Sequence, residues 1–374
     1  MIKIIQVIPN LRKGGAERLV LDICHALSKQ KHIEVLLVTF SSENEYEFLT
    51  RSINWEVVNV QVKPSMSGKS ISNVLELQAI IDLFKPNIVH SHLFESEIVL
   101  SEINYPNAAY FVHFHDAIPQ FKKLQITEVT SKRRLTENYE RKIVLKAYKN
   151  RTNVTALAIS KDTFEYASSN LPSFVKVVLK HNAINTTRFA PSKRTDLTLN
   201  AVTIGSLVEK KGQILAIQTI EYLKSMNIEM KLHVLGNGSK REELETYSKT
   251  NGLSDNVIFH GIVDHPELFL ANADIYLHTA IFEAFGLVLL EAMAVGAPVV
   301  CCDGKGNRDI VFNGENGFIL KEREPEVLAQ TIADLLENKD LKERIKINAL
   351  KFSQKFSIET YADNLIKLYT QDAR

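Results

Sequence analysis

Residues Glu283-Ala284-Phe285-Gly286-Leu287-Val288-Leu289-Leu290-Glu291 are the stretch that decides how this chain is interpreted. An apolar strand-like run, 273–278, comes just before it, and an apolar helical pattern, 287–295, begins inside it. Two carboxylates eight positions apart on one helix are offset by roughly 80°, so Glu283 and Glu291 should not share a face. We therefore expect Glu283 in the turn before the helix and Glu291 about one turn into it.

The first turn of that helix should present main-chain N–H groups to a ligand. The amides near Gly286, Leu287 and Val288 have no partner within the helix, and a helix N-terminus favours a phosphate or diphosphate. Carboxylates are poor phosphate ligands but good acceptors for sugar hydroxyls. Amides for phosphate, together with carboxylates for hydroxyls, predict a nucleotide-sugar site.

The composition is that of a globular protein with more than one core. A chain of 374 residues is too long for one compact core, so two domains are expected. The formal net charge of +1 predicts no general attraction to nucleic acid. The three cysteines suggest no disulfide framework and fit a reducing compartment. Since we see neither a secretory signal nor an apolar run of about 18 residues, we expect a cytoplasmic protein.

Strand-like runs alternate with amphipathic helical runs in both halves of the chain. In the first half, strands are expected at 2–8, 34–40, 87–92, 108–113 and 154–159, and helices at 16–29 and 72–84. A polar, proline-containing stretch, 186–196, is typical of a linker. Strands are then expected at 201–205, 230–235, 257–260, 275–278 and 298–302, and helices at 213–226, 241–250, 287–295, 326–337, 341–356 and 358–370. The alternation predicts two doubly wound α/β domains, whose ligands bind beyond the carboxyl ends of the strands in a cleft between them.

Glycine-rich loops follow the first strand of each half. Gly14-Gly15 allows close approach of the backbone to a ligand, although a tight turn without a ligand is an equal alternative. In the second half, the loop 205–212 carries two lysines that can reach anionic oxygens, or that are simply solvated. Gly236 begins a Gly-x-Gly after another strand and can border a nucleobase or ribose, or only form a turn. Neither a dinucleotide fingerprint nor a P-loop is present.

Four histidines lie at the ends of two successive strands of the first half. His113 and His115 precede Asp116, and a histidine next to an acid can titrate near neutrality or orient a hydroxyl. His90 and His92 end the preceding strand in the same manner. The cluster invites comparison with a metal site, but the usual zinc-ligand spacing and an Asp-x-Asp motif are both missing, so we predict no metal.

The segment Lys122–Arg151 is strongly basic, and apolar residues are interleaved with its charges. Such a segment can lie on an anionic membrane surface, or it can be an ordinary solvated helix face. We predict peripheral contact of this segment with the inner face of a membrane.

These features together resemble the retaining glycosyltransferases called group 1 or family 4, which adopt the two-domain GT-B fold. The resemblance covers nearly the whole chain. Its strongest element is the pair of glutamates separated by seven residues, with the inner Phe-Gly-Leu. The other matching stretches are Gly14-Gly15-Ala16-Glu17, Asn182-Ala183-Ile184-Asn185, the basic loop 205–212, and the glycine-rich stretch 306–317 with its acidic residue Asp309.

The resemblance implies specific roles. Gly15 would bring its amide to the donor diphosphate, and Lys211 would neutralise that diphosphate as it leaves. Glu283 would bind hydroxyls of the transferred sugar, Glu291 would hold the ribose, and His115 would lie near the reacting carbon. The catalytic set is therefore Glu283, Lys211 and His115. The donor-binding set is Gly15, Ser206, Lys210, Lys211, Gly236, Phe285, Gly286, Leu287, Val288 and Glu291. Such enzymes are described as independent of metals, which agrees with the missing Asp-x-Asp.

Some positions depart from the family pattern. Ser206 stands where the family usually has an arginine, so one of two diphosphate-binding cations is absent and Lys210 is its expected substitute. Ala183 and Asn185 stand where glycine and aspartate are commoner. These differences bear on catalytic strength and donor preference rather than on the fold.

We therefore expect an α/β protein with the GT-B fold, formed by a domain at 1–190 and a nucleotide-sugar-binding domain at 191–356, with the helix 357–374 packed back on the first. The expected function is transfer of a hexose-type sugar, with retention, from a UDP- or GDP-sugar to a glycan or lipid-linked acceptor in the synthesis of cell-surface polysaccharide or glycoconjugate. No further cofactor is expected. The alternatives are a non-catalytic scaffold subunit that binds sugar nucleotides, a nucleotide-sugar epimerase or a phosphorylase, and, more distantly, a dehydrogenase.

Overall fold

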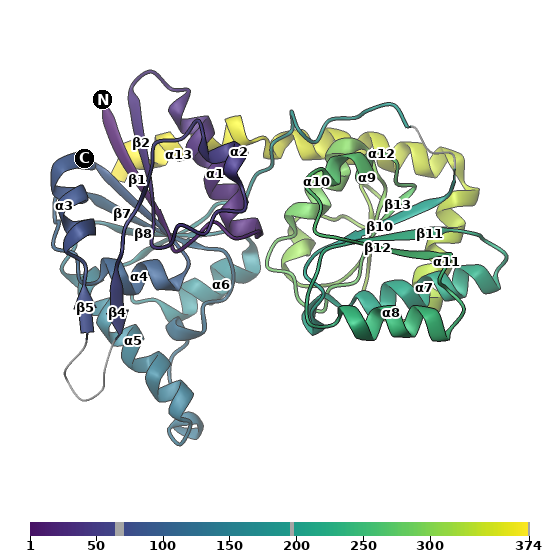
Figure 1. Ribbon diagram of the computed structural model, residues 1–374, viewed down its shortest axis with the longest axis horizontal. Helices are drawn as coiled ribbons and strands as arrows, with labels where there is room; N and C mark the ends of the chain where they lie inside the picture. The colour runs from purple at the N-terminus through teal and green to yellow at the C-terminus, as the bar shows by residue number, and fades with distance from the viewer. Residues whose placement is uncertain (64–70, 195–197, 373–374) are drawn as a thin grey trace. The chain divides into compact units, whose positions relative to one another are not determined.

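The chain forms two compact units in this computed structural model, which describes residues 1–63, 71–194 and 198–372 (Figure 1). Unit 1 comprises Met1–Asn182 and Ile358–Arg374, and unit 2 comprises Ala183–Ser357. The division falls at 182/183 and 357/358, compared with the 190/191 and 356/357 expected from the sequence. Positions 195–196 of the expected linker, and 373–374 of the expected last helix, lie outside the described residues.

Unit 1 is built on a seven-stranded parallel sheet with the order β3-β2-β1-β6-β7-β8-β9. Its strands are β1 (Ile2–Ile8), β2 (Ile33–Thr39), β3 (Trp55–Val57), β6 (Ile88–His92), β7 (Ala109–Phe114), β8 (Val154–Ala158) and β9 (Lys176–Leu179). The order reverses at β1, which lies between β2 and β6. Loops at the carboxyl ends of β1 and β6 therefore meet at a topological switch point, where doubly wound sheets bind their ligands.

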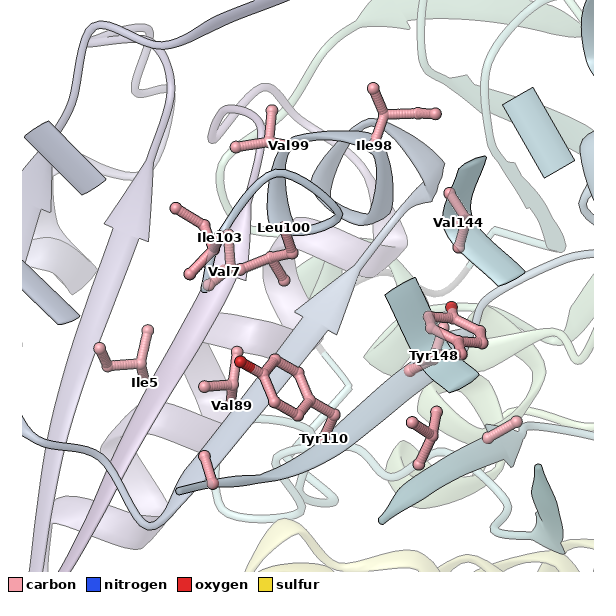
Figure 2. Packing of buried hydrophobic residues seen from close by; sticks show 14 of the residues in the cluster. Ile5, Val7, Val89, Ile98, Val99, Leu100, Ile103, Tyr110, Val144 and Tyr148 are labelled. Carbon is pink, nitrogen blue, oxygen red and sulfur yellow. The ribbon is translucent and has the colours of Figure 1, made fainter. Parts of the chain in front are cut away.

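Helices cover both faces of this sheet. They are α1 (Gly15–Ser28), α2 (Glu47–Thr50), α3 (Leu75–Phe84), α4 (Phe94–Leu100), α5 (Lys132–Lys149), α6 (Lys161–Asn170) and α13 (Ile358–Asp372), with short 3-10 turns η1 (Pro119–Phe121) and η2 (Ile126–Glu128). Figure 2 shows Ile5, Val7 and Val89 of the central strands beside Ile98 and Leu100 of α4 in the apolar cluster of one face. On the opposite face α1 packs against α13, so the end of the chain completes the first unit.

Unit 2 repeats this architecture with a six-stranded parallel sheet of order β12-β11-β10-β13-β14-β15. Its strands are β10 (Asn200–Ile204), β11 (Lys231–Leu235), β12 (Val257–Gly261), β13 (Ile275–His278), β14 (Val299–Cys302) and β15 (Phe318–Leu320). The switch point lies between β10 and β13. Two units of the same strand order confirm the doubly wound α/β prediction.

The helices of unit 2 lie on both faces of its sheet, with α7, α8 and α11 on one side in Figure 1 and α9, α10 and α12 on the other. Their bounds are α7 (Gln213–Ser225), α8 (Arg241–Thr250), α9 (Pro266–Ala271), α10 (Leu287–Val295), α11 (Pro325–Glu337) and α12 (Lys339–Ser353), with 3-10 turns η3 (Glu209–Lys211), η4 (Gly306–Asp309) and η5 (Gln354–Phe356). Helix α10 is buried along most of its length, because β13, β14, α9 and α12 all pack against it.

The helices α5 and α6 of unit 1 were not predicted from the sequence, and several short elements differ from the sequence expectations as well. The helix expected at 72–84 begins at Leu75, because β5 (Ile71–Asn73) pairs antiparallel with β4 (Gln61–Lys63). Three-residue strands such as β3 and β15 have too few residues for a period to be read. The three cysteines, Cys24, Cys301 and Cys302, are buried and free. In the part of the chain that the structure describes, no helix has the length and apolar content needed to cross a bilayer.

Candidate active site

Three side chains of unit 2 meet at the carboxyl ends of β10 and β13. Lys211, in the loop after β10, places its Nζ 2.6 Å from Oε2 of Glu283. His278, the last residue of β13, places Nε2 3.2 Å from the same oxygen. The His278 contact is an electrostatic one, because Nε2 meets no acceptor with hydrogen-bond geometry in the described residues. The switch point of unit 2 is therefore occupied by a carboxylate between two nitrogen groups.

The Glu283 carboxylate is held in its ionised form. Burial raises its pKa, but the His278 imidazole and the Lys211 ammonium outweigh that effect and lower the pKa to about 2. The carboxylate is thus an acceptor of hydrogen bonds throughout the physiological range.

The backbone of Glu283 is clamped on both sides by the glycine-rich stretch after β14. Its N–H donates to the Gly304 carbonyl at 2.8 Å, and its carbonyl accepts from the Gly306 N–H at 2.9 Å. A Cβ on Gly306 would lie 2.0 Å from the Ala284 carbonyl oxygen. Glycine is therefore required at 306 by close packing of one backbone segment against another.

The lysine loop is held by a second set of main-chain contacts. Gly212 has φ +61°, and a Cβ there would lie 2.4 Å from the Thr279 carbonyl oxygen. The Gly212 carbonyl accepts from the Thr279 hydroxyl, and the Lys210 carbonyl accepts from the Ile281 N–H, both at 2.8 Å. Arg323 donates to the Thr279 carbonyl at 2.6 Å. Since these bonds join the loop to the segment leading to Glu283, the two charged side chains are positioned together.

Helix α10 begins directly after Gly286, the glycine between the two glutamates. Gly286 is its N-cap with φ +95°, and Leu287 is its first residue. Phe285 is 2% exposed and its ring centroid lies 6.2 Å from that of Phe356, so its side chain packs in the interior of the unit. First-turn amides of a helix lack intrahelical partners and favour a diphosphate.

Glu291, the second glutamate of the pair, lies near Glu283 without sharing a helix face with it. Glu291 is half-buried, about one turn into α10. Burial, followed by the charges of Glu283 and Glu291, raises the pKa of Tyr276 well above its ordinary value. Both acids therefore lie close to this tyrosine of β13, and the Tyr276 hydroxyl in turn lies 3.2 Å from Nδ1 of His278.

Three other expected donor-binding residues have different surroundings. Gly236 has φ +134°, and a Cβ on it would lie 2.0 Å from the Gly205 carbonyl oxygen, so packing of the backbone explains this glycine without a ligand. Ser206 and Lys210 are both exposed, and the Ser206 carbonyl accepts a hydrogen bond from the Gln213 side chain at 3.0 Å.

In unit 1, the first glycine loop begins α1 at the switch point of the other sheet. Gly14 is the extended N-cap and Gly15 is the first residue of the helix. The Tyr46 hydroxyl accepts from the Gly14 N–H at 3.1 Å and donates to the Gly14 carbonyl at 3.0 Å. The loop is thus fixed from one side while Gly15 opens the helix.

The four histidines of unit 1 form one cluster at the carboxyl ends of β6 and β7. His90, His92 and His113 are at most 1% exposed, whereas His115 is half-buried. Ring centroids of His113 and His115 are 4.2 Å apart and stacked, and those of His90 and His92 are 4.4 Å apart and stacked.

This cluster is arranged for stacking and hydrogen bonding rather than for a shared metal ion. The ligand nitrogens of His90, His92 and His113 lie within 4.8 Å of one another. Tetrahedral zinc would need nitrogens about 3.3 Å apart with converging ring planes. The rings of His90 and His113 are only 8° from parallel, so their lone pairs do not converge.

The histidines are neutral at pH 7. Burial, and then mutual repulsion with neighbouring imidazoles, lowers the pKa of His90, His92 and His115 well below its usual value. Burial lowers the pKa of His113 to about 4, against a hydrogen bond to Asn182 that raises it. Titration near neutrality, which we considered for His115 beside Asp116, is therefore wrong, because desolvation dominates.

Sequence reasoning missed His278, Arg323 and Tyr369. His278 ends its strand just as His92 does, so its place at a strand end was an available signal. Arg323 acts through main-chain carbonyls, and Tyr369 contacts His90 across 279 residues of sequence, so neither gave a local signal. Among the expected residues, Lys211 and Glu283 are in direct contact, while Gly15 and His115 belong to unit 1.

Two family models match consecutive parts of the chain. The model described as Glycosyltransferase Family 4 matches residues 13–188, and that described as Glycosyl transferases group 1 matches residues 186–352. Among curated relatives, the poly(glycerol-phosphate) alpha-glucosyltransferase of Bacillus subtilis is 30% identical over 44% of this chain and 24% of that protein. The capsular polysaccharide biosynthesis glycosyltransferase CapM of Staphylococcus aureus is 26% identical over 63% of this chain and 60% of that protein. The chain thus aligns with less than two thirds of either relative.

Solved structures match the whole chain. Alr3699/HepE of Anabaena, solved in complex with UDP and glucose, has a TM-score of 0.77 at 19% identity and covers 99% of this chain and 100% of its own. A glycosyltransferase of Rickettsia africae has a TM-score of 0.79 at 18% identity, with 100% and 99% covered. These likenesses confirm the GT-B fold. The two family matches, which together span residues 13–352, show that the chain belongs to the group 1 / family 4 glycosyltransferases.

Proposed function

We propose that this protein transfers a hexose-type sugar from a UDP- or GDP-sugar to a glycan or lipid-linked acceptor, with retention of configuration, in the synthesis of cell-surface polysaccharide. The observation that carries the proposal is the contact of Lys211 and His278 with the ionised Glu283 at the switch point of unit 2. Relatives support it: HepE was solved with UDP, and CapM is named for capsular polysaccharide synthesis.

We expect donor binding to break the ion pair between Lys211 and Glu283. Their 2.6 Å ion pair prepares one cation and one acceptor at the same edge of the sheet. A diphosphate attracts an ammonium group strongly, so we expect Lys211 to move to it and Glu283 to accept from sugar hydroxyls instead. Glu291 would take the ribose hydroxyls. Within unit 1, we propose that Gly15 brings its amide to a diphosphate and that His115 contacts a sugar hydroxyl.

The chemical step we propose is heterolysis of the bond between the sugar carbon and the diphosphate oxygen. The leaving diphosphate takes the bonding electrons, and its charge is stabilised by Lys211 and by the amides at the start of α10. The acceptor hydroxyl then attacks from the side on which the diphosphate departs, forms the new bond to the sugar carbon and gives its proton to the departing diphosphate oxygen. We propose that this charge stabilisation needs no divalent metal, and transfer that persists in excess EDTA would support this.

A panel assay tests the proposal. The protein is screened by thermal shift against UDP- and GDP-sugars, and binders are assayed for transfer to glycan acceptors. We expect Glu283→Gln to lose transfer, since the amide cannot supply a charged acceptor, and Glu315→Gln, an exposed glutamate of the same unit, to retain it. Equal activity of the two variants would contradict the assigned site.

The same assay separates the alternatives. A scaffold subunit would bind a donor without transfer or slow hydrolysis with any acceptor, and Ser206 at the usual arginine position favours this reading. An epimerase would convert the donor alone into an isomeric sugar nucleotide. Restoring the second cation with Ser206→Arg should raise transfer if the protein is a transferase, and should leave a scaffold inactive.

We also propose that α5 contacts an anionic membrane surface. Its lysines Lys142, Lys146 and Lys149 are exposed and lie on one helix face, with Lys132 exposed at the start of the helix. Ile126, just before the helix, is 89% exposed. By contrast, Arg134, Arg141 and Arg151 donate hydrogen bonds to main-chain carbonyls. These three basic residues therefore stabilise unit 1 and are not counted as membrane contacts.

Vesicle sedimentation tests this contact. Neutralising Lys142, Lys146 and Lys149 to Gln should lower binding to phosphatidylglycerol vesicles by roughly a hundredfold, at about 1 kcal/mol per lysine. The matched control neutralises three exposed lysines of unit 2, Lys249, Lys339 and Lys351. If both triple variants bind equally, α5 is a solvated face.

A further inference from the structure

A hydrogen-bonded chain of side chains crosses the interior of unit 1 and ends at His115. The Tyr369 hydroxyl on α13 accepts from the Gln6 side-chain amide at 3.3 Å. The Gln6 carbonyl oxygen lies 2.8 Å from Nε2 of His92, and Nδ1 of His92 lies 2.9 Å from Nε2 of His115. Tyr369, Gln6 and His92 are at most 1% exposed, and only His115 is half-buried, so the chain runs from the core to the surface.

The Tyr369 end of this chain determines the direction of its hydrogen bonds. The Tyr369 oxygen lies 2.5 Å from Nδ1 of His90, and we assign the hydroxyl as the donor to that nitrogen. Burial raises the pKa of Tyr369 well above its usual value, so the hydroxyl keeps its proton. Since that single proton goes to His90, the hydroxyl accepts the Gln6 amide N–H, and the Gln6 carbonyl is left to accept from His92.

Each following bond is then fixed in turn. His92 donates its Nε2–H to Gln6, and a neutral imidazole carries only one proton, so its Nδ1 is an acceptor. His115 must therefore donate its Nε2–H to His92, which leaves Nδ1 of His115 without a proton. The Gln6 amide, with one donor end and one acceptor end, transmits the direction set by the tyrosine.

We propose that Tyr369, Gln6 and His92 are positioning residues that hold His115 in the tautomer protonated at Nε2, so that Nδ1 is presented as a hydrogen-bond acceptor for a sugar hydroxyl. The tautomer follows from unit 1 alone, whereas the hydroxyl ligand rests on the proposed function. A neutral imidazole with this tautomer can accept from a hydroxyl and cannot donate to a carbonyl or phosphate oxygen through Nδ1. It therefore favours ligands that bring their own O–H.

The burial of the cluster explains why the chain stays neutral. The positively charged form of His115 would place both ring protons in a region that already holds three other imidazoles, and its pKa is accordingly lowered. Nε2 of His90 and Nδ1 of His113 have no hydrogen-bond partner in the described residues.

Nitrogen NMR of the ligand-free protein, labelled with ¹⁵N-histidine, tests the tautomer directly. We expect the Nε2 resonance of His115 in the range of a protonated ring nitrogen and its Nδ1 resonance in the range of an unprotonated one. In Tyr369→Phe the hydroxyl is lost and Gln6 is free to turn over, so both resonances should move toward an average of the two tautomers.

Tyr361 provides a matched control on the same helix. Its hydroxyl is buried and has no hydrogen-bond partner in the described residues, so Tyr361→Phe removes the same atom without touching the chain. A second variant, Gln6→Leu, removes the acceptor for His92 and should lose the His115 tautomer. His115 protonated at Nδ1 in the wild type, or equal spectra for the two tyrosine variants, would overturn the proposal.

Kinetics with the sugar nucleotide identified by the panel give the functional readout. We expect Tyr369→Phe to lower kcat/KM about tenfold, the effect of one hydrogen bond, at temperatures where the protein is fully folded, and Tyr361→Phe to leave kcat/KM unaltered. The two proposals fail separately. If no sugar nucleotide is transferred, the proposed function falls while the NMR result still decides the tautomer; if transfer occurs and the spectra disagree, only the positioning role falls.

Discussion

The two units share one strand order but hold their polar side chains in opposite electrical states. At the switch point of unit 2, Glu283 is ionised between Lys211 and His278. At the corresponding edge of unit 1, four imidazoles are neutral and linked by hydrogen bonds and stacking. The same fold thus holds an ion pair at the sheet edge of unit 2 and a hydrogen-bonded cluster of neutral imidazoles at the sheet edge of unit 1.

This difference follows from solvent access and from the partners each edge offers. Glu283 keeps its charge because His278 and the Lys211 ammonium, 2.6 Å away, together outweigh the cost of partial burial. Burial, and then the neighbouring imidazoles, lower the pKa of His90 and His92 well below its usual value, so both rings are neutral. In a transferase of the proposed kind, the charged edge suits a diphosphate and the neutral edge suits hydroxyls.

The largest effect that would test the charged edge is loss of the lysine. We expect Lys211→Met to lower kcat by about 10²–10³-fold, the range for removing one group that stabilises developing charge. In a double-mutant cycle with Glu283→Gln, the two losses should be far from additive, because each residue positions the other. Steady-state rates with the panel donor measure this. Additive losses would mean that the two side chains act separately.

Acid sensitivity should distinguish the two units. A buried histidine with a depressed pKa destabilises the native state when it must take up a proton. In the unfolded chain the His113 imidazole has a pKa of about 6.5, whereas in the native unit its pKa is about 4. Stability of unit 1 is therefore complete above about pH 6.5 and falls as the pH drops toward 4. His113 alone corresponds to roughly 3 kcal/mol.

Trp55, the only tryptophan of the chain, lies in β3 of unit 1 and reports on that unit alone. We expect the denaturant midpoint from its fluorescence to fall between pH 6.5 and 4. Hydrogen exchange of the β13 and β14 amides should show unit 2 resisting acid until lower pH. A Trp55 midpoint that stays constant across this range would contradict the neutral, buried state of the cluster.

Glu283 should contribute in a lower pH window. Its pKa is about 2 in the native unit and near 4.5 when unfolded, so its stabilisation is complete above about pH 5 and is lost as the pH falls toward 2. The shift corresponds to roughly 3 kcal/mol at most. Hydrogen exchange measures the free energy of unfolding of unit 2. Between pH 5 and pH 3 this free energy should fall less in Glu283→Gln than in the wild type. An equal loss in both would remove the carboxylate as the cause.

How much of this could be predicted from the sequence depends on the range of each interaction. Three elements have the bounds that their sequence patterns predicted: the strand Ile275–His278 and the helices Arg241–Thr250 and Leu287–Val295. These bounds are predictable because the spacing of apolar residues is a property of neighbouring positions in the sequence. The place of Glu283 before α10 followed from helix geometry in the same way. The chain from Tyr369 to His115 could not be predicted, because its bonds join residues separated by up to 363 positions.

The smallest expected effect concerns the backbone that clamps Glu283. Gly306→Ala places a Cβ 2.0 Å from the Ala284 carbonyl oxygen, and rigid backbone cannot move aside cheaply. Gly314→Ala is the control, since its φ is +74° but nothing lies within 4 Å of the added atom. We expect the control to lose about 1 kcal/mol from backbone strain alone, and Gly306→Ala to lose about 1–3 kcal/mol from overpacking.

Thermal unfolding monitors both glycine variants, and transfer activity separates clamping from stability. Because Gly306 donates its N–H to the Glu283 carbonyl, its displacement should also move the carboxylate away from Lys211. Gly306→Ala should therefore lose more activity than Gly314→Ala even at temperatures where both are fully folded. If the two variants lose activity in proportion to stability, the glycine clamp supports the unit without orienting its acid, and charge at this edge is positioned by the lysine loop alone.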